Sequence, residues 1–121
     1  MKNIKVMEFH QGQAIAVNTY VSIMANACEV VLSHTDEPSK KDSFFWDFAS
    51  LVQDKTMDKV ALANEMIKEV SMKNGEYLKG DFMDLEFPAS QYLWFINIHN
   101  KAVESAHLMM SFNSTDLTII Q

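Results

Sequence analysis

The stretch Ala14–Leu32, AIAVNTYVSIMANACEVVL, decides the fold because it is apolar almost all the way round a helix. One seam at helical spacing consists of Ala14, Val17, Val21, Met24, Cys28 and Val31. A second seam consists of Ala16, Tyr20, Ile23, Ala27 and Val30. The narrow polar stripe that remains consists of Asn18, Ser22, Asn26, Glu29 and Ser33. A helix with so little charge is typical of the centre of a bundle, so we predict a core helix over residues 13–33.

Three further helices are predicted from apolar residues at helical spacing, over residues 41–53, 56–73 and 88–112. Thr56 is the expected N-cap of the third helix, and Gly75 is expected to end it. Pro88 suits the first turn of the last helix. At 121 residues the chain has the length of one domain. We therefore predict a mainly α, single-domain bundle of about four helices over residues 1–121.

Short strands at the two ends of the chain are the alternative to a purely helical core. Met83, Leu85 and Phe87 alternate with Asp84 and Glu86 in the segment 81–87, which is the pattern of a half-buried strand. The terminal segments 4–9 and 116–120 are also apolar enough for strands. The sequence thus leaves open a small two- or three-stranded ribbon made from the termini and the 81–87 segment.

The charge of the chain excludes several classes of partner. Sixteen acidic residues oppose ten lysines, for a net charge of −6, and the chain contains no arginine. Nucleic acids and anionic lipids are therefore poor partners, and the polar residues within residues 14–32 argue against a membrane span. A basic protein is the better partner, because opposite fields speed and orient association. A single cysteine and the lack of a secretory signal fit a cytoplasmic setting.

No pattern in the chain indicates catalysis. Glu104 and His107 match the Glu-x-x-His spacing of di-iron bundles, but a full site needs a second such pair. We therefore expect a surface pair there, with no metal and no cofactor. His99 lies in the apolar stripe of the last predicted helix and is expected to be a core residue with a satisfied ring. Cys28 is expected to be a small buried hydrophobe. The sequence predicts no enzyme.

Partner binding is the function that these observations favour. The candidate site is the acidic segment with Asp81, Asp84 and Glu86, because residues 80–121 carry five acids and one base. Asp36 and Glu37 join it if their loop lies at the same end of the bundle. Trp46 is the candidate aromatic anchor, since the run Phe44-Phe45-Trp46 cannot face inward at every position.

Compact, acidic chains without catalytic motifs are typical of bacterial immunity proteins, which bind and neutralise a toxin. We therefore expect a protein-binding inhibitor of this kind. A phage-encoded inhibitor of a host defence system and a helical small-ligand-binding domain are the alternatives. The oligomeric state stays open.

Overall fold

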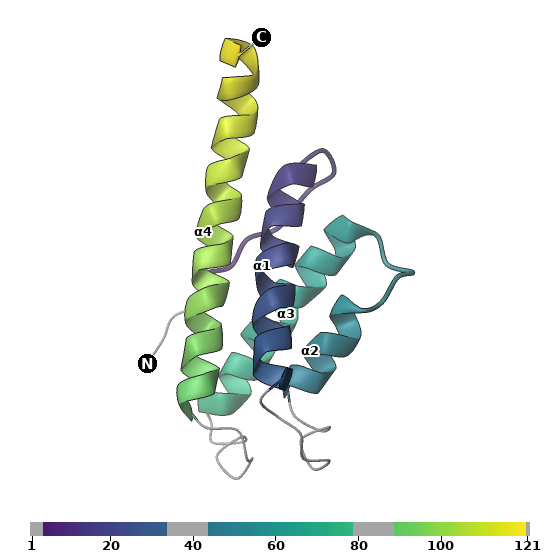
Figure 1. The fold of residues 1–121 in the computed structure, drawn as a ribbon, viewed down its shortest axis with the longest axis vertical. Helices are drawn as coiled ribbons and strands as arrows, with labels where there is room; N and C mark the ends of the chain where they lie inside the picture. The colour runs from purple at the N-terminus through teal and green to yellow at the C-terminus, as the bar shows by residue number, and fades with distance from the viewer. Residues whose placement is uncertain (1–3, 34–43, 79–88, 121) are drawn as a thin grey trace.

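Four helices build the protein, whose computed structural model describes residues 4–33, 44–78 and 89–120 (Figure 1). They are α1 (Ala14–Ser33), α2 (Phe44–Val52), α3 (Lys59–Leu78) and α4 (Ala89–Ile120). The described residues contain no strand. The predicted mainly α bundle of four helices is therefore confirmed.

Helix α1 lies at the centre of the bundle and packs against each of the other three helices. It runs antiparallel to α4, and the two form the largest helix pair (Figure 1). The polar stripe predicted from the sequence is exposed at all five positions. The two apolar seams supply the buried residues Ala16, Val17, Tyr20, Met24, Ala27, Cys28 and Val31. Ala14 and Val30, at the outer ends of the seams, are exposed.

Aromatic rings and methionines fill the space between the helices. Phe48 of α2 and Phe95 of α4 meet edge to face, with ring centroids 5.2 Å apart. Met24 of α1 and Met66 of α3 are both fully buried. Because Phe48 is fully buried, it ties the short helix α2 to the rest of the core.

The ends of α3 differ from the sequence prediction. Asp58 caps the helix, because its carboxylate accepts a hydrogen bond of 3.2 Å from the Ala61 N–H. Thr56 is not the cap, since its hydroxyl and its N–H both donate to the Asp54 carboxylate in the preceding turn. Those two bonds lower the pKa of Asp54. The helix also runs through Gly75 to Leu78, because a glycine costs a helix only about 1 kcal/mol and does not by itself end it.

The alternative ribbon is not supported. Residues 116–120 belong to α4, which projects beyond the start of α1 (Figure 1), so the prediction of a strand there is wrong. A short apolar run is compatible with either helix or strand, and here it continues the helix. Residues 4–9 run without a turn but pair with no strand among the described residues. Segment 81–87 lies outside the described residues.

Helix α1 is also long and apolar enough, by length and composition, to cross a membrane over Ala14–Val31. The core helix of a folded bundle meets the same criteria. In this structure seven residues of that window are buried within the bundle, where α1 packs against the other three helices.

Candidate partner-binding surface

An open apolar groove lies between α1 and α4, on the side that α2 and α3 leave uncovered. Its volume is about 260 Å³. The groove is lined by Ile23, Asn26, Ala27, Val30, Trp94 and Ile98. None of these side chains is charged, although the chain carries 26 acidic and basic residues. We call this feature the Trp94 groove.

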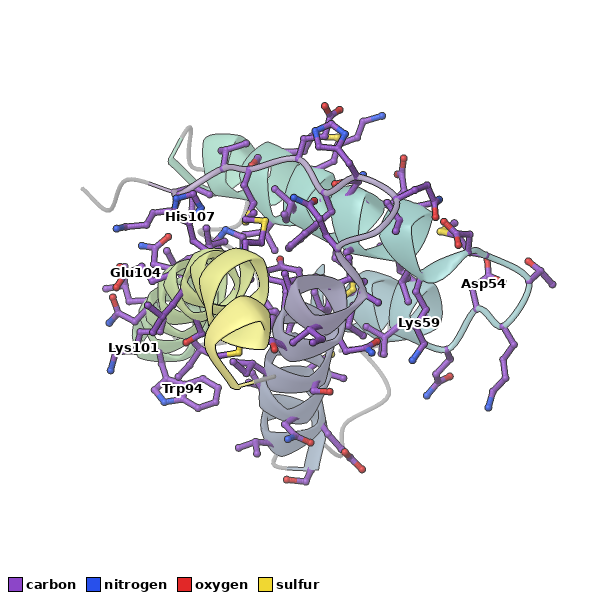
Figure 2. The ribbon with its side chains drawn as sticks, turned by 90° about the horizontal axis from the view of Figure 1, so that it is seen from above. Asp54, Lys59, Trp94, Lys101, Glu104 and His107 are labelled. Carbon is purple, nitrogen blue, oxygen red and sulfur yellow. The ribbon has the colours of Figure 1, made fainter. Side chains whose placement is uncertain are left out.

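Trp94 is the most prominent side chain of the groove, with 40% of its surface exposed. It lies on the outer side of α4, together with Lys101, Glu104 and His107 (Figure 2). Val30, on the facing side of α1, is 48% exposed. A tryptophan that is half seated in an apolar groove keeps part of its large surface available to another molecule.

Sequence reasoning missed Trp94 and chose Trp46. Trp46 belongs to α2, and its side chain lies outside the described residues. Trp94 directly precedes the buried Phe95 and so falls off the apolar stripe of α4. A large aromatic residue on the polar side of an otherwise well-patterned helix was the signal available in the sequence.

The predicted acidic residues Asp36, Glu37, Asp81, Asp84 and Glu86 all lie outside the described residues. The described helices that flank them can be placed. Helix α1 ends at Ser33 and α4 begins at Ala89, and these two ends lie at the same end of the bundle (Figure 1). Val30 and Trp94 each lie within about two helical turns of one of these ends.

A buried polar network ties the middle of α1 to α4 and to the N-terminal segment. The ring of His99 is fully buried. Its Nε2 lies 2.7 Å from the Lys5 carbonyl oxygen, and its Nδ1 lies 2.9 Å from the Tyr20 hydroxyl. A carbonyl only accepts, so Nε2 carries the proton and Nδ1 accepts from Tyr20. The prediction of a core histidine with a satisfied ring is confirmed, and the structure shows that both ring nitrogens are bonded.

Burial also sets the protonation state of this network. It lowers the pKa of His99, although the hydrogen bond to Lys5 partly opposes the shift. Burial raises the pKa of Tyr20, so the hydroxyl remains a donor. The pair therefore stays neutral near pH 7. Because both ring nitrogens of His99 are already bonded inside the core, the pair is suited to holding the structure together rather than to proton transfer.

Residues 4–10 form an N-terminal strap that crosses α3 and α4 and is held through its backbone. The Lys5 N–H donates to the Asn100 side-chain oxygen at 2.8 Å, next to the His99 bond on the Lys5 carbonyl. At Phe9, the backbone N–H donates to the Asn64 side-chain oxygen at 2.8 Å. The Asn64 side-chain nitrogen donates in turn to the Phe9 carbonyl oxygen at 3.0 Å. The Phe9 ring is buried in the core. The strap is thus fixed at two points four residues apart.

Glu104 and His107 do not make the predicted surface pair. Glu104 instead forms an ion pair with Lys5 of the strap, with 2.8 Å between Nζ and Oε2. Figure 2 shows Glu104 and His107 at different positions around the outer side of α4. Within residues 4–33, 44–78 and 89–120, no three His, Cys, Asp or Glu side chains come together as a metal site.

Cys28 is buried, as predicted. Desolvation, reinforced by the neighbouring Glu29, raises the pKa of its thiol to about 12. Only the thiolate is a strong nucleophile, so this thiol is inert at neutral pH.

Comparison with known proteins adds no relative, because no protein-family model, no curated protein and no solved structure matches the chain.

Proposed function

We propose that the protein is a binding inhibitor, which docks on a basic partner protein through the Trp94 groove and the acidic segments next to it. The observation that carries this proposal is the half-exposed Trp94 in an uncharged groove on a strongly acidic chain. Tryptophan is enriched among the residues that contribute most to protein–protein affinity. Charged residues are depleted at the centre of such interfaces and more frequent at the rim.

The acidic segments provide the charged rim in this proposal. Asp36 and Glu37 follow the end of α1 in the chain, and Asp81, Asp84 and Glu86 precede the start of α4. Those two helix ends, at Ser33 and Ala89, lie at the same end of the bundle (Figure 1). The charges of the acidic segments would attract a basic surface, while Trp94 and its neighbours would hold it.

The most concrete form of this function is an immunity protein that neutralises a bacterial toxin in the cytoplasm. A phage-encoded inhibitor of a host defence system would use the same surface. A small ligand is a less suitable occupant of the Trp94 groove than a protein, because this groove is open and its volume of about 260 Å³ is small for a ligand site.

Trp94→Ala is expected to weaken partner binding by at least about 30-fold, since truncating a central aromatic anchor typically costs 2 kcal/mol or more. The partner would be isolated by pull-down from the native host, and its affinity measured by calorimetry. Leu108→Ala is the matched control, because Leu108 is 53% exposed on the same helix, about 21 Å farther along it. Equal loss in both variants, or tight binding by Trp94→Ala, would refute the proposed anchor. Failure to recover any partner protein would favour the ligand-binding class.

Reversing Asp81, Asp84 and Glu86 to lysine is expected to slow association with the same partner by at least about tenfold at low salt. The difference from wild type should shrink as salt rises, because salt screens exposed charges. Stopped-flow association rates across a salt series provide the measurement. Reversal of Glu8 and Glu65, exposed on the strap and α3, is the control and should change the rate much less. If the association rates of the variant and of wild type are equal and neither depends on salt, the acidic segment is not part of the binding site.

A further inference from the structure

The N-terminal strap runs without a turn, and two of its residues direct their backbone groups toward the helices. Lys5 and Phe9, four residues apart, both direct their N–H and C=O groups to side chains of α3 and α4. In an extended chain the backbone groups of alternate residues point to opposite edges. Val6 and Glu8 therefore present their N–H and C=O groups to the other edge.

That other edge is unpaired among the described residues. The backbone groups of Val6 and Glu8 make no hydrogen bond there. From Val6 to Phe9 the side chains alternate as well, since Phe9 is buried and Met7 is half-buried, whereas Val6 is 67% exposed and Glu8 is also exposed. Ile4, which is half-buried, and Lys5, which is exposed, do not continue this alternation. An edge with free donors and acceptors at every second residue is a template for one more strand.

A groove of about 650 Å³ lies beside this edge, between the strap and α3. Val6 and Ile67 line it, together with Met72, which is half exposed. Ser71 lines it as well, and its buried hydroxyl oxygen has no hydrogen-bond partner in the described structure. The groove therefore combines apolar walls with a free backbone edge and a polar group that lacks a partner.

We propose that this edge binds an extended segment of another protein, which adds to the strap as a strand and lies over α3. The free edge selects an extended polypeptide, because only a peptide backbone offers donors and acceptors at the matching spacing. Val6, Ile67 and Met72 select alternating apolar side chains on the inner face of that segment. Glu8, Glu65 and Lys68 at the groove carry net negative charge, which favours lysine or arginine on its outer face.

Two variants of Glu8 test the backbone pairing. Glu8→Pro removes the N–H at the outer edge, whereas Glu8→Ala removes the same side chain and keeps the N–H. Neither change touches the bonds at Lys5 and Phe9. A proline at this position also favours extended backbone in the residue before it, as the strap requires. Far-ultraviolet circular dichroism and urea unfolding would verify that both variants fold like wild type.

The probe is a random peptide library displayed on phage and selected on the immobilised wild-type protein. We expect enriched peptides with alternating apolar residues that bind Glu8→Pro at least about fivefold more weakly than they bind Glu8→Ala, because the two variants lack the same carboxylate and differ in the N–H. Amide exchange should show new protection at Val6 and Glu8 in the peptide complex. Trp94→Ala should leave this binding unchanged, which separates the result from that of the Trp94 groove.

Three results would overturn the proposal. Selection could enrich no peptide, or it could enrich only peptides that bind both Glu8 variants equally. Alternatively, sedimentation could show a wild-type dimer that dissociates in Glu8→Pro but not in Glu8→Ala. That last result would assign the edge to a second copy of this chain in place of another protein.

Discussion

Phe48→Ala is expected to lower the free energy of unfolding by about 3–5 kcal/mol, as is typical of a buried phenylalanine. Phe48 is fully buried and meets Phe95 edge to face, so its loss removes transfer energy and leaves a cavity. Helix α2 has nine residues, which is too short for a stable helix without tertiary packing. Local loosening of α2 should therefore accompany the global loss. Urea unfolding measures the first effect, and amide exchange across residues 44–52 measures the second.

The control for Phe48→Ala is Trp94→Ala, which truncates an aromatic residue that is 40% exposed. Trp94→Ala should lower the free energy of unfolding by less than about 1 kcal/mol. Large losses come from removing buried atoms and leaving cavities, and Trp94 is an exposed residue. If the two variants lost equal stability, the placement of Phe48 in the core would be wrong. The same comparison shows whether Trp94→Ala is folded well enough for the binding experiment.

His99→Ala is expected to cost about 3–5 kcal/mol as well, for a different reason. Besides leaving a cavity, it leaves the buried Tyr20 hydroxyl without its acceptor and the Lys5 carbonyl without its donor. His107→Ala, at an exposed position on the same helix, is the control and should stay within about 0.5 kcal/mol of wild type. Urea unfolding at pH 7.5 provides both values. A mild effect of His99→Ala would mean that the network is not well packed.

The pH dependence of stability gives an independent test of His99. Because burial lowers the pKa of His99 in the folded state, the unfolded chain takes up its proton first as the pH falls. The contribution of His99 to the free energy of unfolding is therefore fully present above about pH 6.5. It is lost as the pH falls from there through the pKa that His99 has in the folded state. The slope is at most about 1.4 kcal/mol per pH unit. The stability gap between wild type and His99→Ala should thus narrow from pH 7.5 to pH 5. A constant gap would show that His99 does not titrate differently in the two states.

The central helix was predictable because its pattern leaves little choice. Two apolar seams and five polar positions define the exposed side of α1, and the structure follows them. The ends of the elements were less predictable. Asp58 and Thr56 are both good capping residues, and only the geometry of the turn at Asp54 decides between them. Residues 116–120 suit a strand or a helix, and the choice depends on what precedes them in α4.

The candidate site was harder to predict than the fold. Trp46 stays the predicted aromatic anchor, because its side chain lies outside the described residues, whereas the exposed Trp94 was not singled out from the sequence. Helical spacing predicts which side of α4 is apolar. Which part of that side α1 leaves exposed depends on how the two helices cross, and the sequence does not show this. The position of the strap could not be predicted from the sequence. It depends on hydrogen bonds between the Asn64 side-chain amide and the distant backbone of Phe9, and such bonds follow no sequence pattern.

The pairing of α1 with α4 has a consequence for how the chain folds. Tyr20 and His99, which join these two helices, lie 79 residues apart in sequence, and Lys5 and Asn100 lie 95 apart. Such distant contacts require long loops to close before they stabilise anything, which slows folding relative to bundles built from neighbouring helices. During synthesis the apolar α1 emerges early and must wait for α4 to be made before its largest interface can form. Over that interval a chaperone, or any other protein with an apolar groove, would compete with α4 for the same surface.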